Sequence, residues 1–149
     1  MYNIREHIHV HAPFYLLKAS HLPFFIRERI QPEISFGATE LDSFGKEDFR
    51  RVGEAFLEAG IPVTLHAPFM DLRPGAVDPR IREASLDRLR QLFDLAPLFR
   101  PRSIVCHPSF DSRYYVSSER QWLENSVAAW KGFLPAAEEL DLMIALENV

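Results

Sequence analysis

The sequence has a single cysteine, Cys106, so an intrachain disulfide framework is excluded. It also lacks any run approaching the roughly 18 consecutive apolar residues that a membrane-spanning helix needs, and it contains no internal repeat or low-complexity segment. These absences argue against a secreted disulfide scaffold, a membrane protein and a repeat protein. A lone cysteine is compatible with a reducing compartment, so we expect a cytoplasmic protein without a membrane partner.

An excess of basic residues is missing as well. The chain has 17 Lys and Arg against 21 Asp and Glu, which gives a net charge of -4. Nucleic-acid binding normally needs a basic surface, so the composition argues against such a partner. The arginines between residues 80 and 90 have acidic neighbours, which is typical of a solvated helix face. The apolar fraction of 47% indicates a globular chain, and the length fits a single domain over residues 1–149.

Segments with strand character alternate with segments of helical character along the whole chain. Five short apolar runs predict strands, at residues 8–14, 32–36, 62–66, 103–107 and 143–146. Four helices are predicted, at residues 20–29, at residues 46–59, after Asp78-Pro79 and after Ser118. Asp78 is a favourable N-cap with proline at the first helical position, and Ser118 with Gln121 matches a capping box.

The apolar residues of the later helices recur at helical spacing, so we expect them to face a core. They are Phe49, Val52 and Phe56 in one helix, Ile81, Ala84, Leu89, Leu92, Phe93 and Ala96 in the next, and Trp122, Val127, Trp130, Phe133 and Ala137 in the last. The run from Met143 to Leu146 is apolar throughout and predicts a buried strand.

Five strands joined by helical crossovers predict an α/β fold with a parallel sheet. Two architectures satisfy this pattern, a doubly wound sheet and part of a (β/α)8 barrel. In both, functional side chains gather at the carboxyl ends of the strands. The strand ends are therefore the place to look for chemistry.

Three of the predicted strands end in a metal-ligating side chain. The third ends at His66 in VTLHAPF, the fourth at His107 in IVCHPSF, and the fifth is followed by Glu147 in IALENV. Two imidazoles and a carboxylate suit a divalent transition metal better than Ca²⁺. A single histidine on an apolar strand is more often a hydrogen-bonded core residue, but three concordant strand ends favour a metal or catalytic site.

Other polar residues have no single interpretation. His7, His9 and His11 share one face of the first strand, where structural or substrate-lining roles compete with the H-x-H metal pattern of amidohydrolase-type barrels. That second interpretation lacks the aspartate those families place nearby. Glu33 either points into a pocket or lies at a strand edge. Cys106 precedes His107 and should point to the opposite face, toward the helices.

The segments LHAPF, PGAVDPRIREAS, IVCHPSF and IALENV together resemble the xylose isomerase-like TIM-barrel superfamily. That group contains sugar and sugar-phosphate isomerases and epimerases, and abasic-site nucleases of the endonuclease IV type. The resemblance implies that His66, His107 and Glu147 bind a divalent metal, which would be Zn, Mn, Co or Mg. It also implies that Glu147 can act as the catalytic base in the isomerase-like members.

The sequence departs from this family in two respects. Ser109 replaces the glycine of the family's His-Pro-Gly pattern, and serine is less permissive than glycine at positive φ. In addition, a (β/α)8 barrel takes about 200 residues at the least. We therefore expect an incomplete barrel of about five strands and four helices, the N-terminal part of the fold and inactive alone. One alternative is that the chain completes itself by pairing with another chain, such as a second copy, through exposed sheet edges. Another is a monomeric five-stranded open sheet.

The function expected from these observations is that of a metal-dependent sugar or sugar-phosphate isomerase or epimerase acting on a small carbohydrate. An endonuclease IV-like abasic-site nuclease is an alternative, although the acidic composition argues against it. A non-enzymatic binding or assembly module is the third hypothesis.

Overall fold

A computed structural model of the chain describes residues 8–147, and these form one sheet with helices. The strands are β1 (Val10–Pro13), β2 (Pro32–Ser35), β3 (Thr64–His66), β4 (Ser103–Cys106) and β5 (Met143–Leu146). The helical segments are α1 (Phe14–Leu16), the π-helical η2 (Leu17–His21), α2 (Leu22–Arg27), α3 (Ala38–Ser43), α4 (Lys46–Glu58), α5 (Pro79–Phe99) and α6 (Glu119–Glu139).

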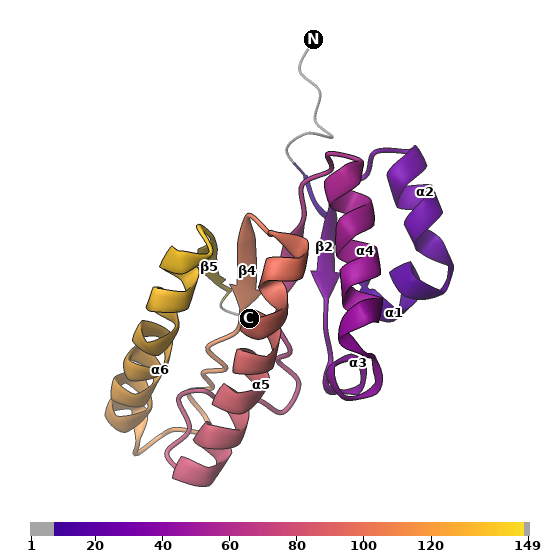
Figure 1. The fold of residues 1–149 in the computed structure, drawn as a ribbon. Helices are drawn as coiled ribbons and strands as arrows, with labels where there is room; N and C mark the ends of the chain where they lie inside the picture. Colours follow the sequence, from indigo (N-terminus) through magenta and orange to yellow (C-terminus); the bar gives the residue numbers. More distant parts are fainter. Residues whose placement is uncertain (1–7, 148–149) are drawn as a thin grey trace.

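The five strands are all parallel and follow one another across the sheet in the order β1-β2-β3-β4-β5. A doubly wound sheet would reverse its strand order at a switch point, so this topology excludes that architecture. Sequential parallel strands joined by helical crossovers are the geometry of a TIM barrel. The described residues thus form a five-stranded part of a TIM-barrel fold, and Figure 1 shows α4 and α5 lying over one face of the sheet.

The register of the strands separates an apolar face from a polar face. Ile34 pairs with Leu65, and Leu65 pairs with Ile104; all three are fully buried under the helices. The alternate positions face the other way because successive strand residues point to opposite sides. Glu33 is therefore beside Thr64 on the polar face of the sheet.

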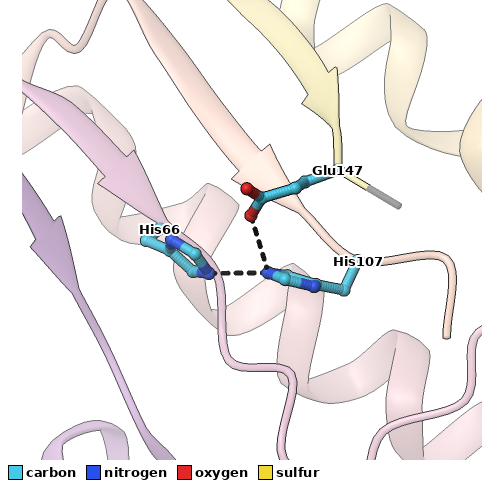
Figure 2. A group of neighbouring side chains, drawn as sticks. All are labelled: His66, His107 and Glu147. Atoms are coloured by element: carbon cyan, nitrogen blue, oxygen red, sulfur yellow. Dashed lines mark hydrogen bonds and ion pairs between the residues drawn. The ribbon is translucent and has the colours of Figure 1, made fainter. Parts of the chain in front are cut away.

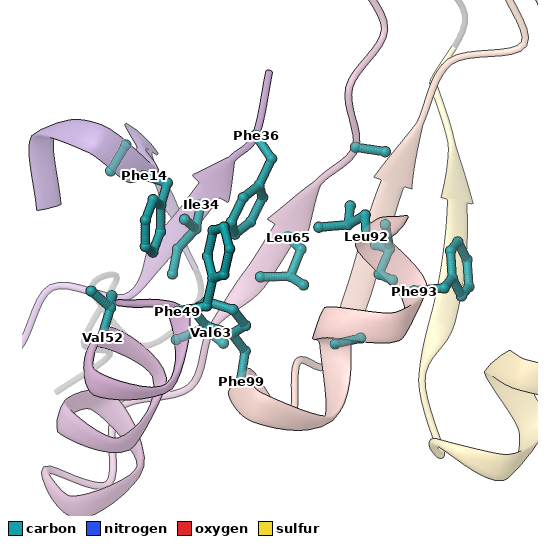
Figure 3. Packing of buried hydrophobic residues seen from close by; sticks show 14 of the residues in the cluster. Phe14, Ile34, Phe36, Phe49, Val52, Val63, Leu65, Leu92, Phe93 and Phe99 are labelled. Atoms are coloured by element: carbon teal, nitrogen blue, oxygen red, sulfur yellow. The ribbon is translucent and has the colours of Figure 1, made fainter. Parts of the chain in front are cut away.

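The core lies between the sheet and the helices and is rich in phenylalanine (Figure 3). The ring of Phe14 lies 4.7 Å from that of Phe49 on α4 and 5.4 Å from that of Phe36. Phe93 of α5 stacks on Phe133 of α6 with ring centroids 4.7 Å apart. Burying each such side chain contributes about 1.5–3 kcal/mol, so these rings account for much of the packing between helices and strands.

Helices α4 and α5 are in close contact at Gly53. A Cβ atom at this position would lie 2.2 Å from the backbone oxygen of Leu98. No side chain fits at that distance, so the close contact between the two helices depends on glycine here.

The predicted starts of the two long helices are correct. Asp78 caps α5, and its side chain accepts hydrogen bonds from the backbone N–H groups of Arg80 and Ile81. Helix α6 begins directly after Ser118, but the Ser118 side chain makes no capping hydrogen bond. The capping-box contact is therefore wrong, because the backbone of Ser118 (φ −134°, ψ 18°) is not extended as that motif requires.

The N-terminal part of the chain is more helical than predicted. Strand β1 ends at Pro13, and Phe14 opens a nearly continuous helical stretch that runs to Arg27. Helix α3, at residues 38–43, was not predicted either. It is short and has no buried residue, so it lacks the apolar periodicity on which the sequence argument depends.

Several residues expected in the core are exposed. Ile81 and Ala84 lie in the first turns of α5 and are exposed. The helix has 21 residues and is therefore much longer than the four-residue strand β4, so its first turns extend past the sheet. Val127 is exposed because Ser126 and Trp130 occupy the buried stripe of α6.

Strand β5 is not buried as predicted. Met143 is 67% exposed and Leu146 is 51% exposed. Within residues 8–147, β5 pairs only with β4, so one side of this strand has no neighbouring strand to cover it.

Among the same residues, no helix is both long and apolar enough to cross a membrane.

Candidate metal centre

Three adjacent strands deliver His66, His107 and Glu147 to the same edge of the sheet. His66 is the last residue of β3, while His107 and Glu147 directly follow β4 and β5. The backbone ladder continues past these ends, since the Glu147 N–H donates to the Cys106 oxygen at 2.9 Å. The carboxyl ends of parallel strands share one edge, and Figure 2 shows the three side chains converging there.

The ligating atoms of the three residues all lie within 4.8 Å of one another. His66 Nε2 is 2.8 Å from His107 Nε2, and His107 Nε2 is 3.4 Å from Glu147 Oε2 (Figure 2). Both histidines are buried, whereas the Glu147 side chain is 51% exposed. The centre therefore combines two fixed imidazoles with one carboxylate that solvent and small molecules can reach.

Glu33 determines which nitrogen of His66 carries the proton. Glu33 Oε1 lies 2.8 Å from His66 Nδ1, and an ionised carboxylate can only accept a hydrogen bond. His66 Nδ1 must therefore be the donor, which leaves the Nε2 lone pair facing His107. When the His107 proton is on Nδ1, the three facing atoms His66 Nε2, His107 Nε2 and Glu147 Oε2 are all acceptors, and such a set favours a cation between them.

The surroundings of His107 favour its neutral form. Burial lowers the pKa of His107, and the neighbouring His66 lowers it further, while Glu147 and Glu33 oppose this change. A neutral imidazole is the form that binds metals. His107 Nδ1 is buried without a hydrogen-bond partner among residues 8–147, so Nε2 is the nitrogen that serves the centre.

Phe69 forms an apolar wall beside the two imidazoles. Its ring stacks on His107 with centroids 4.6 Å apart and an interplanar angle of 29°, and its centroid is 5.5 Å from that of His66. This packing limits the rotation of the imidazoles and covers one side of the centre, while Phe69 itself is 44% exposed.

A cavity of about 650 Å³ opens from the centre toward solvent. It is bounded by the loop after β3, the loop after β4 and the end of β5, and its lining residues are Phe69, Asp71, Leu72, Arg73, His107, Ser109, Phe110, Asp111, Ser112, Arg113 and Glu147. This volume is in the range of small-molecule sites.

His9 and His11 of the polar face do not join the cluster. His11 is exposed, and its ring meets that of His66 edge-on at 6.0 Å. His9 Nδ1 lies 3.1 Å from the backbone oxygen of Pro32 and 3.3 Å from Thr64 Oγ1, so its contacts are structural. His7 lies outside the described residues.

Cys106 is fully buried, and desolvation raises the pKa of its thiol to about 12. Its side chain lies among the apolar core residues on the helix side of the sheet, as the alternation with His107 predicted. A thiol in this environment is not a nucleophile.

Ser109 adopts the left-handed conformation expected of the glycine that it replaces, with φ of 57°. Holding a non-glycine residue there costs about 1–2 kcal/mol. The loop after β4 therefore keeps the path that a glycine would allow, and Ser109 lines the cavity.

Sequence reasoning missed Phe69, Arg73 and the contact between Glu33 and His66. The sequence pattern predicts only a loop for FMDLRPG, although an aromatic and a basic residue shortly after a functional strand end are a usable signal. The role of Glu33 depends on strand register, which the sequence did not show.

Comparison with known proteins agrees with this architecture. A family model described as a xylose isomerase-like TIM barrel matches residues 32–149. The solved structure of a D-tagatose 3-epimerase-like protein superposes with a TM-score of 0.71 and 18% identity, covering 95% of this chain and 53% of that protein. A Thermus thermophilus protein soaked with ZnCl2 gives a TM-score of 0.70 and 19% identity, covering 94% of this chain and 55% of that protein.

In sequence, an uncharacterized protein of Methanocaldococcus jannaschii is 25% identical over 89 residues, which is 60% of this chain and 30% of that protein. The chain thus spans about half the length of the two solved structures and about a third of this relative. At these identities the structural likeness shows the fold alone.

Proposed function

Because the chain belongs to the xylose isomerase-like TIM-barrel family, we propose that it supplies the divalent-metal site of a sugar or sugar-phosphate isomerase or epimerase. The observation that carries this proposal is the convergence of His66 Nε2, His107 Nε2 and a Glu147 oxygen within 4.8 Å. Nitrogen and carboxylate donors in this number suit Zn²⁺ or a similar transition metal, with a position left for substrate.

His66, His107 and one oxygen of Glu147 would hold the metal. Glu33 would keep His66 in the required tautomer through its 2.8 Å contact with Nδ1. A metal bound there would polarise the carbonyl and hydroxyl oxygens of a sugar. Phe69 would cover one side of the imidazoles.

Glu147 is the residue we assign to proton transfer. Its side chain is half exposed at the cavity, and only one of its oxygens is directed to His107, at 3.4 Å. The other oxygen can take a proton from the carbon next to a polarised carbonyl and return it after the enediolate has rearranged. A carbohydrate substrate is proposed by analogy, from the xylose isomerase-like family and from the name of the D-tagatose 3-epimerase-like protein that shares the fold.

The alternative of an abasic-site nuclease has weaker support. The net charge of -4 does not favour DNA, and the cavity lining contains three carboxylates and two arginines. The hypothesis of a non-enzymatic module predicts that purified protein binds no stoichiometric metal and converts no sugar.

The experiment is a zinc titration by calorimetry, combined with an NMR assay on a panel of ketoses and ketose phosphates. We expect one zinc ion per chain, and Glu147→Gln should weaken zinc binding at least tenfold and abolish any turnover. Glu139→Gln, an exposed change of the same kind on α6, serves as the control and should change neither. Unchanged zinc affinity and turnover in Glu147→Gln would show the assignment to be wrong, and incision of abasic duplex DNA would favour the nuclease.

A further inference from the structure

Arg73 brings an arginine to the same cavity that contains His107 and Glu147. It lies in the loop between β3 and α5, and its guanidinium carbon is 4.4 Å from the ring centroid of Tyr114 in the following loop. Among residues 8–147, the Arg73 side chain has no ion pair with a carboxylate. A stacked guanidinium keeps its N–H donors at the edges of the plane, free for another acceptor.

Arg113, the second arginine that lines the cavity, does have an ion pair with a carboxylate. Arg113 pairs with Asp111 at 3.5 Å, and its side chain is 92% exposed. Asp111 also accepts from the backbone N–H of Arg113 at 2.9 Å, and these contacts lower the pKa of the Asp111 carboxyl. Arg113 therefore extends into solvent with one long contact to Asp111, whereas Arg73 is stacked on Tyr114 and is the cation of the cavity with a defined position.

The loop that carries Arg73 is held firmly by both long helices. The Arg73 N–H donates to the buried Ser85 hydroxyl of α5 at 2.8 Å, and the Asn125 side chain of α6 donates to the Ala76 oxygen at 3.0 Å. Gly75 lies so close to Trp122 that a Cβ atom would be 2.6 Å from the indole nitrogen. Such anchoring positions the guanidinium before any ligand binds, which reduces the entropic cost of binding.

We propose that Arg73 binds a phosphate group of the substrate, so that the cavity accepts a phosphorylated sugar rather than a neutral one. The fork of N–H donors in a guanidinium matches two oxygens of a phosphate. The hydroxyls of Ser109 and Ser112, which also line the cavity, can donate to the third oxygen. The identity of the ligand as a sugar phosphate rests on the function proposed above, whereas the oxyanion site does not.

The charges of the lining indicate that a bound metal ion would strengthen phosphate binding. Asp71, Asp111 and Glu147 outnumber the two arginines by one negative charge, and a bound divalent cation would reverse this balance. A phosphate and a metal ion should therefore strengthen each other's binding, since each reduces the repulsion that opposes the other.

In the first test, inorganic phosphate is titrated into the metal-free chain in the presence of a chelator, and ³¹P NMR measures the affinity for phosphate. Arg73→Gln should weaken phosphate binding at least tenfold, and Arg113→Gln, which removes the same charge from the same cavity, should weaken it less than twofold. Equal losses in the two variants would mean nonspecific attraction and overturn the proposal, as would unchanged binding in Arg73→Gln. Thermal unfolding of both variants verifies that they are folded.

Two further binding measurements identify the chemical class of the ligand. Acetate in place of phosphate should bind at least tenfold more weakly; equal affinity with the same dependence on Arg73 would assign the site to carboxylates instead. D-Fructose 6-phosphate should bind the zinc-loaded chain more tightly than D-fructose, and this preference should vanish in Arg73→Gln. Zinc binding without phosphate binding would refute this subsite alone, while phosphate binding without zinc binding would refute only the metal centre.

Discussion

The Nδ1 nitrogen of His66 lies 2.8 Å from Oε1 of Glu33, a residue of the neighbouring strand whose position is fixed by the parallel register of β2 and β3. The contact is partly buried, with the Glu33 side chain 26% exposed. It directs the opposite nitrogen of His66 toward His107 and Glu147. A carboxylate behind a ligating histidine orients the ring and raises its basicity.

Replacing Glu33 should therefore weaken metal binding without removing any of the three proposed ligands. We expect Glu33→Gln to reduce zinc affinity about 10- to 100-fold, because a neutral amide holds the Nδ1 proton less strongly. Calorimetric titration measures this loss. Glu54→Gln, at an exposed position of α4, is the matched control, and an unchanged affinity in Glu33→Gln would exclude a positioning role.

Zinc should stabilise the folded chain by mass action. At a free zinc concentration of 100 times Kd, the free energy of unfolding should rise by about 2.7 kcal/mol, because the ligand geometry exists only in the folded state. Thermal unfolding with and without zinc measures the change in Tm, and a chelator should reverse it. The same increase in His107→Ala would place the bound zinc elsewhere.

The thiol of Cys106 should be inaccessible to reagents in the native protein. Burial raises its pKa to about 12, so the reactive thiolate is almost absent at pH 8. We expect no reaction with a thiol-specific reagent under native conditions and one equivalent after unfolding in urea. Rapid native labelling would contradict the burial of this side chain.

The raised pKa of the Cys106 thiol also predicts a loss of stability in alkaline solution. An unfolded cysteine has a pKa of about 8.5, so between this value and about 12 the folded chain retains a proton that the unfolded chain releases. Unfolding becomes more favourable as pH rises through that window. Urea unfolding between pH 7 and 10 measures the slope, which should be smaller in Cys106→Ala.

Two glycines within helices should respond oppositely to alanine. In Gly53→Ala the new methyl group meets the Leu98 oxygen at 2.2 Å, so α4 and α5 must separate and the protein should lose about 1–3 kcal/mol of stability. In Gly132→Ala nothing lies within 4 Å of the added Cβ, and the helix preference of alanine should add about 0.5–1 kcal/mol. Urea unfolding compares the two, and a stabilised Gly53→Ala would disprove the close packing.

The parallel α/β sheet and the positions of its five strands could be predicted from the sequence, because apolar runs and helix caps are local signals. The meeting of His66, His107 and Glu147 could be predicted as well. Each stands at the carboxyl end of its own strand, and parallel strands bring those ends to one edge. Their role as metal ligands stays a prediction, since proximity alone does not identify a bound ion.

Other features depended on the tertiary structure. The exposure of Met143 follows from the edge position of β5, and the short α3 has no buried residue to mark it. The contact of Glu33 with His66 depends on the register of two strands, and the stacking of Arg73 on Tyr114 depends on the paths of two loops.

The sequence by itself thus determined which chemical groups stand at the strand ends, because that depends on local pattern. Only the tertiary structure decided how those groups are oriented and what surrounds them, because such contacts join residues far apart in the chain.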